Sequence, residues 1–193
     1  GDLSMKRTLL ASALAFSALG SAQAAQAQQA CVAPEDAADA VVYAMPAAYD
    51  ATLNRCKSEF NEESFLVSAE GSNFVEQFRT QQDERWAGTF RFLKFFISAQ
   101  SDGDDGMGEM IAAMDEEALR PFVDGILGQM IGDQIKTDTC ATIDRGVELL
   151  SPLPAENVGG LVAFVLELVE LDNPPVCGPD GTVQVIPVGP LGE

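Results

Sequence analysis

Residues 158–171 read VGGLVAFVLELVEL, and this stretch decides the fold expected for the chain. At about 100° per residue, as in an α-helix, its only polar stripe consists of Gly160, Ala163, Glu167 and Glu170. A helix that is apolar almost all round is normally buried on most sides, so we expect it to be the core of the domain. It cannot cross a membrane, because about 20 apolar residues are needed and two glutamates interrupt it.

A second helix is predicted directly before it, over residues 138–150, and the short connection makes the two helices antiparallel. This hairpin returns the chain toward Cys140, so we expect a disulfide between Cys140 and Cys177. The chain has four cysteines and no histidine, which favours two disulfides over a zinc site. Pairing Cys140 with Cys177 leaves Cys31 to pair with Cys56.

Residues 34–57 show the apolar periodicity of another helix, with Pro46 in its middle. Two interpretations conflict here. The apolar phase continues through Pro46, which favours one continuous helix. A continuous helix would hold Cys31 and Cys56 about 37 Å apart, at a rise of about 1.5 Å per residue, and would prevent their pairing. We favour a break at Pro46, which keeps the sequential disulfide.

The start of the chain has the pattern of a secretory signal peptide. Residues 5–7 (MKR) are basic, residues 8–20 are apolar, and small-x-small cleavage sites follow at residues 22–24 and 25–27. The apolar run is too short for a membrane anchor, so no stable membrane insertion is expected after cleavage. The pattern therefore predicts export, to a bacterial periplasm or out of the cell.

This organisation divides the chain into three parts. Residues 1–27 are the upstream residues and the cleaved signal peptide, and residues 28–177 form one helical domain. Residues 178–193 form a flexible tail rich in proline and glycine. We therefore predict an all-α, single-domain bundle of five to six helices, held together by disulfides.

A long helix is predicted over residues 72–99, with one face rich in aromatic side chains. Phe95 projects from its polar side and is a candidate contact for another chain or a ligand. A further helix, over residues 120–136, is predicted to begin after a break near Leu119. The methionines before it form a short stripe that extends the possible apolar contact surface: Met107, Met110 and Met114.

A glycine-rich acidic loop, residues 101–109 (SDGDDGMGE), is the one stretch that resembles a metal site. Close carboxylates in such a loop are suited to a hard cation such as calcium. The loop does not fit the EF-hand pattern in any register, so a solvated turn is the favoured interpretation and no metal is predicted. The candidate ligands are Asp102, Asp104, Asp105 and Glu109.

Composition excludes several functions. The formal net charge of −19 at pH 7 repels phosphates, so nucleic acid is not expected as a partner. Without histidine there is no Ser-His-Asp or Cys-His nucleophile. Glu116 and Glu117 stand at the start of a helix, where acidic residues complement the helix dipole. We predict no enzyme, no catalytic residue and no cofactor.

These observations favour an exported helical protein that acts by binding or interaction. In the first hypothesis it holds an apolar small molecule or an unfolded protein client between its helices. In the second it is a structural or oligomeric subunit without a ligand. A carboxylate-based hydrolase is the least favoured, because it needs two acidic residues facing one pocket.

Overall fold

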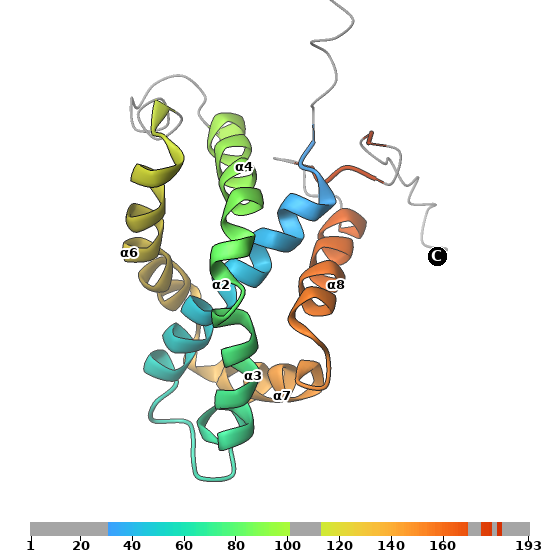
Figure 1. Cartoon of the computed structure of the whole chain (residues 1–193). Coiled ribbons are helices and arrows are strands. Elements are labelled where there is room, and N and C mark those ends of the chain that lie inside the picture. The colour runs from blue at the N-terminus through green and yellow to red at the C-terminus, as the bar shows by residue number, and fades with distance from the viewer. Residues whose placement is uncertain (1–30, 101–112, 170–174, 179–180, 183–193) are drawn as a thin grey trace, which may run out of the picture. The chain divides into compact units, whose positions relative to one another are not determined.

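The computed structural model describes residues 31–100, 113–169, 175–178 and 181–182 (Figure 1). Within these ranges the chain is all-α, with six α-helices and two short 3-10 helices, which confirms the predicted fold class. The predicted signal segment and most of the predicted tail lie outside them. The α-helices are α2 (Pro34–Arg55), α3 (Ala69–Arg79), α4 (Gln82–Gln100), α6 (Glu116–Gln134), α7 (Cys140–Leu150) and α8 (Ala155–Leu168), and the 3-10 helices are η1 (Phe65–Val67) and η2 (Thr137–Thr139).

The central helix is α2. It packs against α3, α4, α6 and α8, most extensively against α4 and α8. In Figure 1, α6 and α8 lie on opposite sides of α4, and α2 passes behind α4. The prediction that the stretch from Val158 onward forms the core is therefore wrong, because α8 buries only the side that faces α2.

The core consists of several apolar clusters arranged along α2. One joins α2 to α3 and α8, and another joins α2 to α4 and α6. Tyr43 and Trp86 pack with ring centroids 5.0 Å apart in the second cluster. The buried members of the first are Val42, Phe74, Phe78, Ala155 and Val158, and those of the second are Tyr43, Trp86, Leu119 and Val123.

The predicted break at Pro46 is wrong, because α2 continues through this residue. Proline removes one backbone hydrogen bond from a helix interior, at a cost of about 3 kcal/mol. Pro46 is buried, and the packing of four helices on α2 offsets that cost. The continuous apolar phase, which favours one unbroken helix, therefore predicts the structure better than the presence of proline does.

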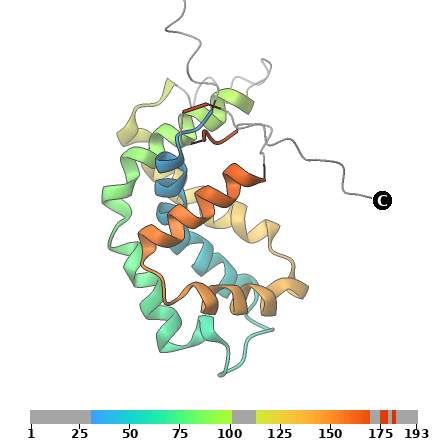
Figure 2. The ribbon, with the colours of Figure 1, turned by 90° about the vertical axis from the view of Figure 1, so that its right-hand side faces the viewer.

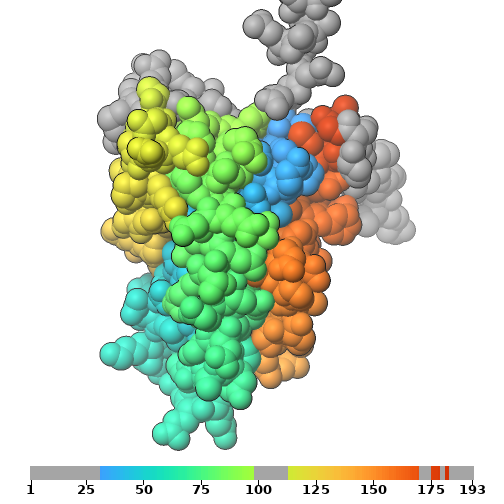
Figure 3. All heavy atoms as spheres, in the orientation of Figure 1, coloured from blue at the N-terminus to red at the C-terminus, as the bar shows by residue number. Residues whose placement is uncertain are grey.

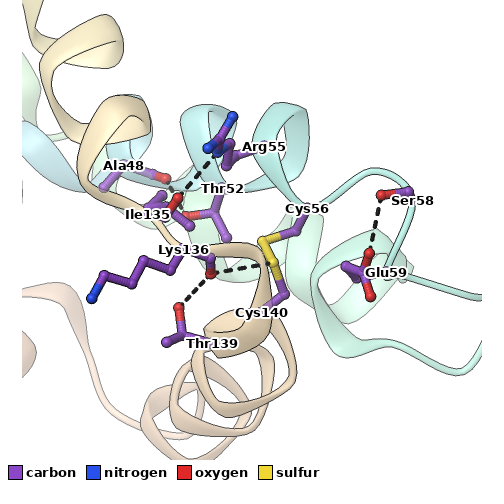
Figure 4. Close-up of a disulfide and its surroundings, with 10 residues drawn as sticks. All are labelled: Ala48, Thr52, Arg55, Cys56, Ser58, Glu59, Ile135, Lys136, Thr139 and Cys140. Atoms are coloured by element: carbon purple, nitrogen blue, oxygen red, sulfur yellow. Dashed lines mark hydrogen bonds between the residues drawn. A yellow bond between two sulfur atoms is a disulfide. The ribbon is translucent and has the colours of Figure 1, made fainter.

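Continuity of α2 changes the disulfide pairing. Cys31 and Cys56 lie at opposite ends of this helix, so neither reaches the other. Cys31 bonds Cys177 and Cys56 bonds Cys140, with Cα atoms 5.1 Å and 5.7 Å apart. The involvement of all four cysteines in disulfides is confirmed, whereas the predicted Cys140–Cys177 and Cys31–Cys56 pairs are wrong. Figure 4 shows Cys56, just after α2, joined to Cys140 at the start of α7.

The other disulfide is reinforced by backbone hydrogen bonds. The Val32 N–H donates to the carbonyl of Pro175 at 2.8 Å, and the Cys177 N–H donates to the carbonyl of Val32 at 2.8 Å. These bonds form an isolated parallel bridge between Val32 and Val176. Residues 175–177 are thereby fixed to the start of α2.

Two helix boundaries differ from the prediction. The aromatic-rich stretch forms two helices, α3 and α4, separated at Thr80 and Gln81. Helix α6 begins at Glu116 rather than near residue 120, because the Asp115 side chain caps it by accepting a hydrogen bond from the Ala118 N–H at 2.8 Å. Glu116 and Glu117 stand in its first turn, as predicted. No helix in the described ranges is long and apolar enough to span a membrane.

Candidate functional site

Phe95 does not lie where the sequence predicts. It is partly buried and packs, with Phe92, against the cluster of Val32, Ala37 and Ala163. Its neighbour Phe96 is 36% exposed. Helix α4 buries two sides, because Trp86, Phe90 and Leu93 pack in the cluster between α2 and α6, whereas Phe92 and Phe95 pack against the cluster of Val32, Ala37 and Ala163. A prediction with a single buried face therefore leaves Phe95 on the exposed side.

The other predicted contact and metal residues give little support for a site. Met114 is partly buried and packs against the core between α4 and α6. Met107 and Met110 lie outside the described residues, as do all four candidate cation ligands, Asp102, Asp104, Asp105 and Glu109. Among the residues that the structure does describe, no group of three or more Cys, Asp or Glu side chains is placed to hold a metal ion.

Helix α8 presents its small residues to the core. Ala155, Gly159 and Ala163 follow one another at intervals of four and are buried against α2. A Cβ added to Gly159 would lie 2.7 Å from Cγ2 of Val42 and 2.8 Å from the carbonyl oxygen of Ala38. At Gly159 the helix therefore sits so close to α2 that no larger side chain fits at this position.

Val158 is also buried, but four other large apolar side chains of α8 point the other way. Leu161, Phe164, Val165 and Leu168 are between 44% and 52% exposed, and we call these four residues the α8 apolar face. They are spaced i, i+3, i+4 and i+7, so they form one continuous ridge along the helix. Val169, at the C-cap, continues the exposed apolar surface. In Figure 3 the atoms of α8 lie along the right-hand side, next to those of α4.

One edge of this face is acidic. Glu156, Gly160 and Glu167 share it, because residues four and eleven positions apart lie on the same side of a helix. Neither glutamate forms an ion pair within the described part of the chain, and α8 contains no lysine or arginine. The face thus combines an apolar ridge with an uncompensated negative border.

The helices around α8 are fixed by specific contacts. The carboxylate of Asp144, on α7, accepts hydrogen bonds from the N–H groups of Phe65 and Leu66 at 3.1 Å and 2.8 Å. The Tyr49 hydroxyl donates to the carbonyl of Leu66 at 2.5 Å. With the two disulfides, these contacts attach α7 to α2 and the segment after α8 to the start of α2. The helices around the α8 apolar face are therefore cross-linked by hydrogen bonds and disulfides.

A polar groove lies between α2 and α6, with a volume of about 580 Å³. Two of its carboxylates already have partners, since Asp50 pairs with Arg79 at 2.8 Å and Asp124 accepts a hydrogen bond from Tyr43. The described residues contain no buried polar side-chain atom without a hydrogen bond. Nothing in this groove favours a particular ligand. Its lining residues are Ala47, Asp50, Ala51, Asn54, Arg55, Asp124, Gly128, Gln129, Gly132 and Asp133.

The least exposed acidic residues join helices. Asp36 on α2 accepts hydrogen bonds from the Arg91 guanidinium at 2.7 Å, and Asp39 pairs with Arg85 at 3.1 Å, so both tie α2 to α4. The hydrogen bond to Asp36 raises the pKa of Arg91. Burial and the hydrogen bond to Asp124 raise the pKa of Tyr43, although Arg120 opposes this shift. These ion pairs and this hydrogen bond stabilise the packing of the helices.

Comparison of the chain with protein-family models, with curated proteins and with solved structures finds no match. Among the described residues, the α8 apolar face is the feature that favours a binding site, because it exposes contiguous large apolar side chains. Its apolar residues are visible in the sequence, where they predict a buried helix. The spacing of Ala155, Gly159 and Ala163 identifies the side of α8 that can approach another helix closely. The opposite side is then the outward one.

Proposed function

We propose that this protein acts by binding, without catalysis, and that the α8 apolar face is its binding surface. One observation carries the proposal: α8 turns its small residues inward and four large apolar side chains outward. A surface helix normally does the reverse, because large apolar side chains gain most from burial. Contiguous exposed apolar surface in a folded protein commonly marks an interaction site.

The free energy available from burying the α8 apolar face is modest. Burying the exposed half of one Leu, Val or Phe side chain contributes about 1 kcal/mol, so the face supplies about 4 kcal/mol. Association costs at least about 4 kcal/mol in lost translational and rotational freedom. Apolar burial on this face alone would therefore give weak binding, and a specific partner needs further contacts around it.

Export forms part of the proposal. The signal-like pattern of residues 1–27 supports it, and so do the two disulfides, which form and persist in oxidising compartments such as the periplasm or the extracellular space. Intact-mass measurement of the secreted protein tests it: the mature chain should begin near Ala25 or Gln28. Retention of residues 5–24 would contradict export by this signal.

The binding proposal is tested with a dye that fluoresces on apolar surface. The wild type should bind it, and the double variant Phe164→Ser/Leu168→Ser should lose most of the signal. Met130→Ser is the matched control, because Met130 is 60% exposed on α6, away from α8 (Figure 1). Equal signals from the wild type and the double variant would contradict the proposal, as long as circular dichroism shows both folded.

Native mass spectrometry of the protein purified from its own compartment provides the second measurement. A bound mass should accompany the wild type and the Met130→Ser control and should be absent from the double variant. A bound mass that survives the double substitution would place binding elsewhere. The mass itself also separates a small apolar molecule from a polypeptide.

A further inference from the structure

We propose that the α8 apolar face receives an amphipathic helix of another polypeptide, one with Lys or Arg along a single side of its apolar stripe. This inference rests on the binding function proposed above and names the class of partner. It follows from the shape of the face, from the spacing of its residues and from its charge.

The shape favours a helix over a small molecule. Small apolar ligands are held in concave sites that enclose most of their surface. The α8 apolar face is a ridge along the outer side of α8. Figure 2 shows this helix running across the front of the described helices. Ridges on one helix pack into the grooves between side chains on another. The complement of this ridge is thus a second helix.

The spacing sets the length of the partner. From Leu161 to Leu168 the apolar side chains follow the i, i+3, i+4, i+7 pattern over two turns. A partner must present apolar residues at the same spacing over at least two turns to cover them. Glu156 and Glu167 are eleven residues apart, about 16 Å along the helix axis. Basic residues that reach both must therefore span about three turns of the partner.

The charge decides between a foreign partner and a second copy. The chain carries a net charge of −19, and α8 offers two glutamates and no basic residue. A second copy paired antiparallel through the same face would place both acidic edges on the same side, and its total charge would add repulsion at neutral pH. A helix with Lys or Arg on one side would instead pair with Glu156 and Glu167. An anionic membrane surface is disfavoured for the same reason as a second copy.

The acidic edge is open to such a partner. Gly160 lies between Glu156 and Glu167 on this edge, and a Cβ placed on it would meet nothing within 4 Å. The side chain of Glu156 is exposed, and that of Glu167 is partly exposed. The aliphatic part of a lysine or arginine can therefore lie over Gly160 while its charge reaches either glutamate.

The experiment uses the full chain and synthetic peptides of about 20 residues, long enough to form helices. All peptides carry the same leucine stripe and differ along one side, which is Lys, Gln or Glu. Fluorescence anisotropy should show the Lys peptide binding about tenfold more tightly than the Glu peptide, because a few partly exposed ion pairs change affinity by about that factor. Raising the salt from about 0.1 M to about 1 M, which shortens the Debye length from about 10 Å to about 3 Å, should reduce the difference.

Charge reversal gives the decisive comparison. Glu156→Lys/Glu167→Lys should invert the preference, so that the Glu peptide binds more tightly. Phe164→Ser/Leu168→Ser should abolish binding of all the peptides, whereas Met130→Ser should leave it unchanged. Circular dichroism establishes that each variant is folded.

The possible failures are distinguishable. If the peptides bind equally and the double serine variant loses binding, the face is a binding surface but the basic-partner inference is wrong. If no peptide binds while the dye signal still depends on Phe164 and Leu168, the helical partner is wrong and the proposed function stands. Sedimentation that shows oligomers of the wild type, lost in the double serine variant, would make a second copy the occupant and overturn the inference. If the wild type bound neither the dye nor any peptide, the proposed binding function would be wrong as well.

Discussion

Gly159 of α8 and Val42 of α2 lie so close that a methyl group on Gly159 would stand 2.7 Å from Cγ2 of Val42. The same methyl group would stand 2.8 Å from the carbonyl oxygen of Ala38, a backbone atom that cannot move aside easily. This contact sets the distance between the two helices. It also excludes any larger side chain at position 159 of α8.

Gly159→Ala should therefore destabilise the protein, by about 1–3 kcal/mol, because overpacking outweighs the gain of about 1 kcal/mol in helix propensity. Gly160→Ala is the matched control on the neighbouring residue. A Cβ there meets nothing, so this variant should be more stable than the wild type by about 0.5–1 kcal/mol. Denaturant unfolding measures both. A Gly159→Ala protein as stable as Gly160→Ala would mean that the helices are not in close contact.

Much of the fold follows from the sequence, and the errors share one cause. Helical periodicity is local, so the all-α class and most helices can be predicted from residues that are near one another in the chain. The continuity of α2 at Pro46 depends on four helices that pack around it. The apolar phase through Pro46 indicates a continuous helix, but neither the packing that stabilises it nor the disulfide partners of Cys31 and Cys56 can be read from neighbouring residues.

The candidate site is even harder to predict from local sequence than the fold. A helix that is apolar nearly all round gives no indication of which apolar side is buried, so α8 was assigned to the core. The predicted exposure of Phe95 is wrong because α4 buries a second side, where Phe95 packs against the cluster that contains Val32 and Ala163. The small-residue spacing that ends at Ala163 indicates which side of α8 can pack closely against another helix. It does not indicate which helix, because α2 is distant from α8 in the sequence.

The disulfide connectivity makes a direct prediction. Peptide mapping without reduction should link Cys31 to Cys177 and Cys56 to Cys140. Replacing both members of either pair by alanine should cost about 2–5 kcal/mol, because each bond closes a long loop and restricts the unfolded chain. A peptide joining Cys31 to Cys56 would show that α2 is not continuous as described.

The alkaline limit of stability should depend on Tyr43. Its pKa is raised by burial and by the hydrogen bond to Asp124, so the folded state holds the phenol proton more tightly than the unfolded state. That contribution is complete below about pH 10, the ordinary tyrosine pKa, and is lost as the pH rises further. The free energy of unfolding should then fall by up to about 1.4 kcal/mol per pH unit for this residue.

Tyr43→Phe tests this linkage. The variant should lose about 1 kcal/mol near pH 7, where the hydrogen bond to Asp124 contributes. Above pH 10 its stability should decline less steeply than that of the wild type. Some decline should remain, because burial also raises the pKa of Tyr49. Parallel curves for the two proteins between pH 10 and pH 11 would contradict the shift.

Asp144 connects α7 to η1, and its removal should show how strongly α7 is held. Each carboxylate oxygen accepts one backbone hydrogen bond, from Phe65 and from Leu66. Asp144→Ala leaves both N–H groups without this partner in a partly buried place, so it should cost about 2–3 kcal/mol. Asp144→Asn should cost less than alanine, since the amide oxygen still accepts one of the two bonds.

The matched control for Asp144 is Glu148→Ala, one turn further along α7. Glu148 forms an exposed ion pair with Arg145 at 2.7 Å, and such a pair contributes at most about 0.5 kcal/mol. Denaturant unfolding at pH 7 should therefore rank the proteins as wild type, Glu148→Ala, Asp144→Asn and Asp144→Ala in decreasing stability. If the two alanine variants were equally stable, the carboxylate of Asp144 would not be the attachment of α7 to η1.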